Sequence, residues 1–155
     1  MRLSQAAEHA LRAALFLASR PRRNARLPEI ARAQGIPPAS LSRALRCLAG
    51  RGIILSAAGY QGGYRMLKDP AQVSLRQVIE AAEGPIFYSH CPFHGNVCDR
   101  ESRHWCPVHD VWEAAKRDFL EALESQTLQD LVGRMARWST VERLLEEVAR
   151  NPAAR

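Results

Sequence analysis

The sequence predicts a mostly α-helical fold with a small β-hairpin wing: a winged helix-turn-helix followed by a long C-terminal dimerisation helix. Three features of the 155-residue chain support this prediction. Apolar residues recur with the period of an α-helix through most of the chain. Two short helical segments flank Gly35, and the second is rich in arginine. A glycine-rich turn then separates two short runs of strand-forming residues.

Three helices are expected before residue 50. Over residues 4–20 the apolar side chains fall on one helical face, and Pro21 ends the pattern. A second helix is expected over 28–34, with Gly35 as its stop residue, and a third over 38–49. Two short helices joined by a glycine-containing turn are typical of a helix-turn-helix, whose second helix enters the major groove of DNA.

A β-hairpin is expected directly after the third helix. Residues 53–56 and 64–67 are short strand-like runs, and residues 58–63 form a flexible, glycine-rich tip between them. A hairpin in this position is the wing of a winged helix, which would contact the adjacent DNA backbone or minor groove.

The second half of the chain is expected to be helical on both sides of an irregular segment, residues 86–107. Ser74 and Gln77 form a capping box for a short helix that ends at Glu83. A long helix over 107–124 follows, and then two further helices over 127–138 and 139–150. The predicted division is therefore a DNA-binding domain over 1–70, a connecting helix and cysteine-rich loop over 71–106, and a dimerisation helix with C-terminal helices over 107–150.

The apolar face of the 107–124 helix allows two interpretations. It could pack on the first helix of the same chain, or it could form the seam of a homodimer. We favour the dimer, because a small winged helix leaves little room to bury another long helix and because twofold operators are read by twofold proteins.

The charge distribution favours a polyanionic partner. The formal net charge is +6, but residues 1–68 hold 12 Lys and Arg residues against two acidic ones, whereas residues 69–155 hold 10 against 14. A basic half joined to an acidic half is typical of a nucleic-acid-binding module that carries a second function.

The chain shows neither a glycine-rich phosphate loop nor an evident pair of catalytic carboxylates, so we expect no enzymatic activity. Without an apolar run of about 18 residues or a secretory signal, we expect a cytoplasmic protein with no membrane partner.

Three cysteines and a histidine follow one another with the spacing C-x6-C-x7-C-x2-H: Cys91, Cys98, Cys106 and His109. Thiolates are soft ligands that select zinc, copper(I) or iron–sulfur clusters, and three thiolates and an imidazole within nineteen residues can converge on one metal centre. The alternative is that the cysteines are buried as small apolar side chains. That alternative suits the isolated Cys47, and His90, His94 and His104 are taken as ordinary loop residues.

These features together resemble a known family of bacterial winged-helix regulators, the Rrf2 family. The resemblance is carried by Met1-Arg2-Leu3-Ser4, the Glu29-Ile30-Ala31 segment with Gly35-Ile36, the Gly62-Gly63-Tyr64-Arg65 wing and the three-cysteine loop before a long helix. It covers roughly residues 1–132. It implies a homodimer that binds a double-stranded operator and carries one iron–sulfur cluster per subunit, with 2Fe–2S favoured over 4Fe–4S.

The resemblance also suggests ligands for the cluster. Cys91, Cys98 and Cys106 fall on the three cluster cysteines of the family. The fourth ligand varies within the family: His109 matches one pattern, and Glu8, donated by the partner subunit, matches the other. We favour His109. The cysteine spacings are longer than usual in the family by one or two residues.

DNA contacts are expected from the third helix and the wing. Ser40, Ser42 and Arg43 would face the major groove, and Arg46 would hold a phosphate. Tyr60, Gln61 and Arg65 would contact the backbone or the minor groove. The function expected is a transcriptional regulator whose DNA affinity responds to the state of its cluster, through redox, iron or nitric oxide. The alternative is a winged-helix regulator with zinc or with a cluster-free thiol redox switch.

Overall fold

Helix α1 (Gln5–Ala18) lies at the centre of a winged-helix unit in the computed structural model, which describes residues 3–59, 62–86 and 108–137. Ser4 caps the helix, because its hydroxyl accepts a hydrogen bond from the Ala7 amide at 3.2 Å. The buried face of α1 is mostly alanine, so that α3 and α4 can approach it closely. The helix predicted over residues 4–20 is therefore confirmed.

The helix-turn-helix is formed by α2 (Leu27–Gln34) and α3 (Pro38–Gly50). Gly35 adopts a left-handed conformation with φ of 60°, and the amide that follows it, that of Ile36, bonds back to the Ala31 carbonyl at 3.1 Å. This hydrogen bond ends α2 and turns the chain into α3. Both predicted helices and the glycine stop are confirmed.

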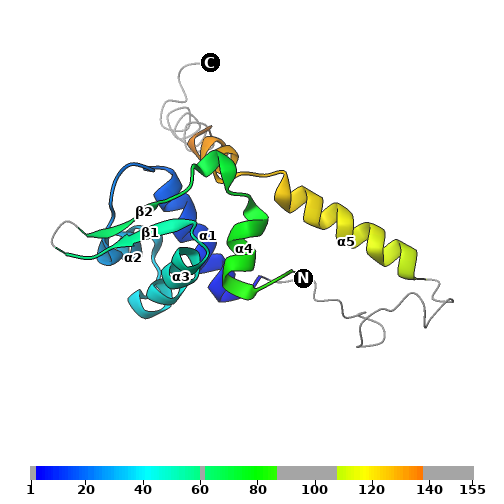
Figure 1. The fold of residues 1–155 in the computed structure, drawn as a ribbon, viewed down its shortest axis with the longest axis horizontal. Helices are drawn as coiled ribbons and strands as arrows, with labels where there is room; N and C mark the ends of the chain where they lie inside the picture. Colours follow the sequence, from blue (N-terminus) through cyan, green and yellow to red (C-terminus); the bar gives the residue numbers. More distant parts are fainter. Residues whose placement is uncertain (1–2, 60–61, 87–107, 138–155) are drawn as a thin grey trace, which may run out of the picture.

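The wing consists of β1 (Ile54–Ala57) and β2 (Gly63–Met66), paired antiparallel with Ile54 opposite Met66. Each strand lies within one residue of its predicted position. The structure adds a pairing that the sequence did not predict. Ala25, in the connection between α1 and α2, exchanges two backbone hydrogen bonds with Tyr64, at 2.8 and 2.9 Å. Figure 1 shows this connection running beside the hairpin.

Gly63 permits this pairing. Its φ is 145°, and a Cβ atom placed on it would lie 2.7 Å from the Ala25 carbonyl oxygen. Any side chain at position 63 would therefore push the connection away from the wing.

The hydrophobic core joins these elements. Its fully buried large side chains come from α1 to α3, from the start of the wing and from the segments around α4: Leu17, Ile30, Leu41, Leu45, Leu48, Ile53, Ile54, Val73, Val78 and Leu128. The 3-10 helix η1 (Pro70–Gln72) leads from the wing to α4 (Leu75–Glu83). Ser74 caps α4 as predicted, accepting from the Gln77 amide at 3.2 Å, but the reciprocal bond of the predicted capping box is not formed, because Gln77 Oε1 is buried without a hydrogen-bond partner.

Helix α5 (His109–Glu124) projects from this unit as an arm (Figure 1). None of its residues is buried, and Val111 is 68% exposed. Packing of this helix against α1 within one chain, one of the two interpretations, is therefore wrong for the chain as the structure describes it. No described helix is long and apolar enough to cross a membrane.

The end of α5 is held against the start of α4. The Leu75 amide donates to the Gln126 carbonyl at 2.7 Å, the Leu128 amide donates to the Val73 carbonyl at 2.9 Å, and the Ser74 hydroxyl donates to Glu124 at 3.2 Å. We call these contacts the α4–α5 clamp. It fixes the base of the arm to the winged-helix unit.

The described part of the chain ends with a helix over residues 128–137, which follows the clamp. Thr127 and Asp130 form its capping box, in which the Thr127 hydroxyl accepts from the Asp130 amide at 3.2 Å and the Asp130 carboxylate accepts from the Thr127 amide at 3.1 Å. Hydrogen bonds from the Thr127 side chain and backbone hold the pKa of Asp130 below its ordinary value. The helix predicted over 127–138 is thus confirmed where it is described, whereas the one predicted over 139–150 lies outside the described residues.

Candidate nucleic-acid interface

Helix α3 turns an arginine-bearing face away from the core. Leu41, Ala44, Leu45 and Leu48 are buried, and the helical period puts Arg43 and Arg46 on the opposite side, where both are exposed. Ser40 is also exposed, and Ser42 is half-buried at the edge of the face. The helix contains no acidic residue. Within the described part of the chain, neither Arg43 nor Arg46 forms an ion pair, so both guanidinium groups can take up an external anion.

The wing carries one further predicted DNA-binding cation, Arg65. Met66 of β2 points into the core, and because alternate residues of a strand point to opposite faces, Arg65 points away from the core. Arg65 is half-buried and lies opposite Leu55. Tyr60 and Gln61, which were also predicted to contact DNA, lie outside the described residues.

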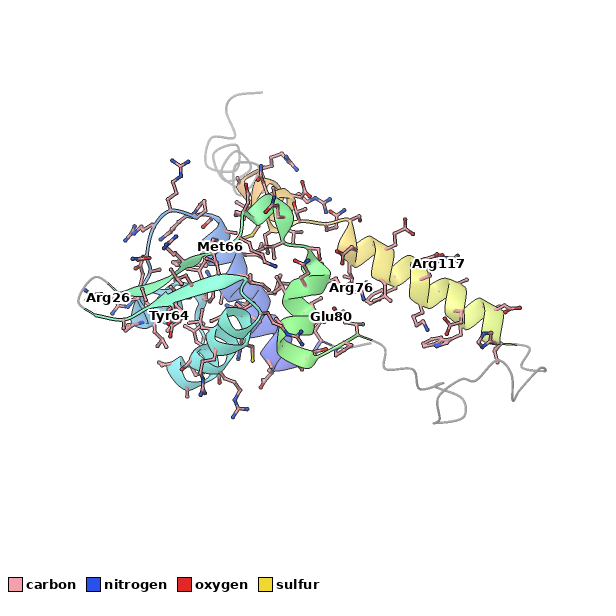
Figure 2. The ribbon with its side chains drawn as sticks, in the orientation of Figure 1. Arg26, Tyr64, Met66, Arg76, Glu80 and Arg117 are labelled. Carbon is pink, nitrogen blue, oxygen red and sulfur yellow. The ribbon has the colours of Figure 1, made fainter. Side chains whose placement is uncertain are left out.

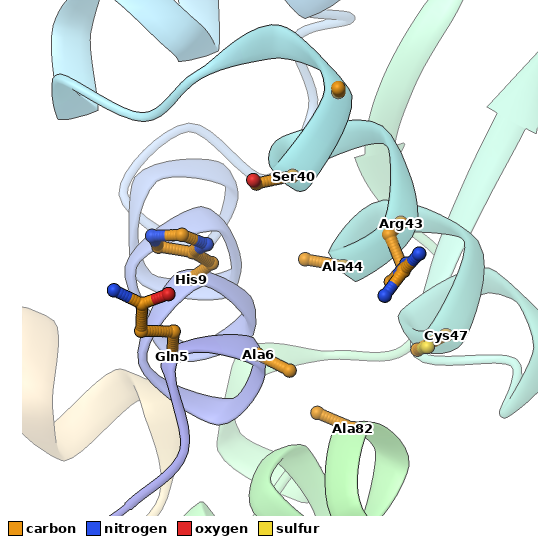
Figure 3. Close-up of a pocket in the computed structure, with 9 residues that line it drawn as sticks. Gln5, Ala6, His9, Ser40, Arg43, Ala44, Cys47 and Ala82 are labelled. Atoms are coloured by element: carbon orange, nitrogen blue, oxygen red, sulfur yellow. The ribbon is translucent and has the colours of Figure 1, made fainter.

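A hollow of about 300 Å³ borders α3 on the side of α1 (Figure 3). Ser40, Arg43 and Cys47 line it from α3, Gln5 and His9 from α1, and Ala82 from α4. Sequence analysis did not predict this hollow, because the small alanine side chains that leave it open come from three separate helices. Cys47 is half-buried at its edge.

The predicted metal ligands are only partly described. Cys91, Cys98 and Cys106 lie outside the described residues, as do His90, His94 and His104. His109 is the first residue of α5, at the outer end of the arm, whereas Glu8 lies in the first turn of α1 (Figure 1). Arg12 pairs with Glu8 at 3.3 Å. No three His, Cys, Asp or Glu residues among those described could hold a metal ion together.

Comparisons with known proteins agree with this fold. The family model Rrf2, described as an iron-dependent transcriptional regulator, matches residues 3–134. A protein of Rhodobacter capsulatus, named as an rrf2-like HTH-type transcriptional regulator, is 30% identical over 94% of this chain and 99% of its own length. An HTH-type transcriptional regulator of Synechocystis is 31% identical over 92% of this chain and 95% of its own length.

Solved structures show the same architecture. CymR, the global cysteine regulator of B. subtilis, superposes with a TM-score of 0.71 at 23% identity, over 86% of this chain and 98% of that one. T. potens IscR superposes with a TM-score of 0.69 at 24% identity, over 87% and 88%. The relatives are named as transcriptional regulators, not as enzymes. With the family model covering most of its length, this chain belongs to the Rrf2 family of winged-helix, DNA-binding transcriptional regulators.

Proposed function

We propose that this protein is an iron–sulfur-cluster-sensing bacterial transcriptional regulator that binds operator DNA as a homodimer. The observation that carries the proposal is the match to an iron-dependent regulator model across residues 3–134, a range that includes Cys91, Cys98, Cys106 and His109. In this proposal the state of the cluster changes the affinity or the specificity of the dimer for its operator.

The DNA is read by α3 and by the wing. Arg43 and Arg46 are exposed on one face and separated by three positions, so one helix can present both to the major groove. Arg43 is placed for base readout, with Ser40 and Ser42 beside it, and Arg46 for a phosphate. Arg65 on the wing is placed for the backbone or the minor groove, together with Tyr60 and Gln61.

Replacing Arg43 with alanine is expected to weaken specific binding by about 1–3 kcal/mol, which is roughly 5- to 150-fold, because a guanidinium on a base edge is lost. Fluorescence anisotropy on a duplex selected by the wild-type protein from a random library measures this. The matched control is Arg117→Ala on α5, which removes the same charge from a side chain that is 72% exposed. Equal losses in both variants would remove Arg43 from the reading face.

The second copy is placed along α5. Apolar residues recur on one face of α5 and its N-cap residue Val108, and none of them is buried in the single chain: Val108, Val111, Trp112, Ala115, Phe119, Ala122 and Leu123. An apolar face of this length on a projecting helix is what two copies would bury against each other. A twofold axis at this seam would carry the two α3 helices to two half-sites of one operator.

The cluster ligands proposed are Cys91, Cys98, Cys106 and His109, with Glu8 of the partner subunit as the alternative to His109. Three thiolates and one imidazole suit an iron–sulfur cluster, and 2Fe–2S is favoured. Such a group would supply a centre whose oxidation, nitrosylation or loss reports on redox state, nitric oxide or iron. His109, as the first residue of α5, would join this centre directly to the dimer helix.

The described contacts offer a continuous physical route from α5 to the DNA. The α4–α5 clamp holds the base of α5 to the start of α4, and α4 packs against both α1 and α3. A change in the direction of α5 would therefore move the two α3 helices of a dimer relative to each other. A coupling of about 1–3 kcal/mol changes affinity about 5- to 150-fold, which is enough for a switch.

The proposal is tested by metal analysis and visible absorbance of protein purified without air. The expected result is iron with acid-labile sulfide and absorbance between about 300 and 500 nm, the region of thiolate–iron transitions. Protein that contains zinc, or thiols alone, and still binds the selected duplex would replace the cluster by the zinc or thiol-switch alternative.

A further inference from the structure

A basic surface beside the wing is not accounted for by the residues assigned above. The connection between α1 and α2 carries Arg22, Arg23 and Arg26, and all three are exposed. Because Ala25 is hydrogen-bonded to Tyr64 through both of its backbone groups, this connection is held against β2. Its arginines are therefore placed by the wing and would move with it.

The arginines of this connection differ in their partners. Glu29 pairs with Arg20 at 3.4 Å and with Arg23 at 3.3 Å, so these two cations are partly neutralised within the chain. Arg22 forms no ion pair with any described residue. Arg26 borders a hollow of about 420 Å³ between the connection and the hairpin. We call this the Arg26 hollow.

The lining of the Arg26 hollow fits an anionic backbone better than a side chain or a base. Arg26, Leu27 and Tyr64 line it together with five small residues of the hairpin, namely Ser56, Ala57, Gly59, Gly62 and Gly63. None of these lining residues is acidic. Small residues let an external chain approach the hairpin closely, and the arginine fork matches the oxygens of a phosphate. Figure 2 shows Arg26 and Tyr64 at the wing end of the molecule, far from Arg117 on α5.

We propose that Arg22, Arg26 and the wall of the Arg26 hollow bind phosphodiester groups of the DNA backbone that flanks the bases read by α3. This inference rests on the proposed function, because it extends the same interface beyond the wing. The surface would position the protein on the duplex and would not read sequence. Each phosphate contact releases counterions, so its loss has a measurable signature in the dependence of binding on salt.

The test compares R22A/R26A with wild type and with R117A on two duplexes selected by the wild-type protein. One duplex is full length, and the other is trimmed by about five base pairs, half a helical turn, at each end. The double variant removes two arginines from each subunit of the proposed dimer, so the slope of log affinity against log salt should be shallower by about 3.6. A fourfold rise in salt should therefore cost it roughly 100-fold less affinity than it costs the wild type. The loss should be larger on the full-length duplex, and base preferences should stay unchanged.

Further variants guard against loss of folding. R22K/R26K keeps both charges and should restore the salt slope, and a thermal melt should show all variants folded, since the tie to Tyr64 uses backbone atoms alone. A double variant with the wild-type slope would overturn the inference, as would one with altered base preference. If Arg43→Ala still weakens binding in that case, the proposed function stands without this surface. If neither change matters, the proposed function fails as well.

Discussion

Replacing Val111 with aspartate is expected to convert the proposed dimer into monomers. Val111 is the most exposed large apolar side chain on α5, at 68%, so the change should cost the isolated chain little. In a seam between two α5 helices, each aspartate would be an unpaired buried charge, and an uncompensated charge of this kind costs about 3–5 kcal/mol. Since the two half-sites would then be bound separately, affinity for a twofold duplex should fall about 10²- to 10⁴-fold.

Sedimentation of the variant and anisotropy on the selected duplex measure the two effects together. Arg117→Asp is the matched control, because it places an aspartate on the same helix, on the side opposite the apolar face. A Val111→Asp protein that sediments as the wild type does and binds the duplex equally well would contradict a seam on α5. Loss of helical content in the far-ultraviolet spectrum would show that the aspartate unfolds α5 itself and does not merely separate two copies.

Replacing Cys98 with alanine is expected to give a colourless protein that has lost its iron. In the proposed site the Cys98 thiolate would be a ligand of the metal, and alanine offers no donor atom in its place. In the proposed mechanism the variant should behave as the cluster-free protein. Its affinity for the selected duplex should therefore differ from that of the loaded wild type by about 5- to 150-fold.

Cys47→Ala is the control for this experiment. Cys47 is half-buried on α3 and belongs to the winged helix, not to the predicted ligand loop. That variant should keep full colour and full iron content. A brown Cys98→Ala protein with as much iron as the wild type would sink the assignment of Cys98 as a ligand, whereas loss of iron from Cys47→Ala would move the metal centre toward α3.

Local signals in the sequence predicted most of the winged helix. The alanine and leucine period of α1, the helix stop at Gly35 and the capping residue Ser74 each act within a few residues of where they stand. Such short-range effects can be recognised from the sequence because they depend on the chemistry of neighbours. The wing was found for the same reason, since Gly62 and Gly63 mark the turn and short apolar runs flank it.

Long-range pairing could not be predicted in this way. The bridge between Ala25 and Tyr64 joins residues 39 positions apart through backbone atoms, so the identity of the two side chains does not predict it. The basic residues around Ala25 are visible in the sequence, but only the fold shows that they lie beside the wing. The α4–α5 clamp is similar, because a backbone bridge between Ser74 and Thr127 leaves no mark on composition or period.

The role of α5 shows where the sequence left a real choice. Its apolar period is equally compatible with a core helix and with a helix that binds another copy, since both need one apolar face. The structure excludes the core helix, because no α5 residue is buried within the described chain. The cysteine-rich loop was predicted from spacing alone: Cys91, Cys98 and Cys106 predict a metal centre. Of these predicted ligands and His109, the structure describes His109, the first residue of α5.

The most direct measurement is the affinity of anaerobically purified wild-type protein for its selected duplex, taken before and after a chelator removes the metal, with iron and acid-labile sulfide quantified in each sample. If thiols at positions 91, 98 and 106 hold a 2Fe–2S centre that governs the DNA-reading helices, the untreated sample should carry about two irons and two sulfides per chain. Chelation should then change the dissociation constant by about 5- to 150-fold. The claim that a cluster governs DNA binding would be contradicted by wild-type protein that contains no iron or sulfide and binds the duplex as tightly as a variant that lacks all three thiols.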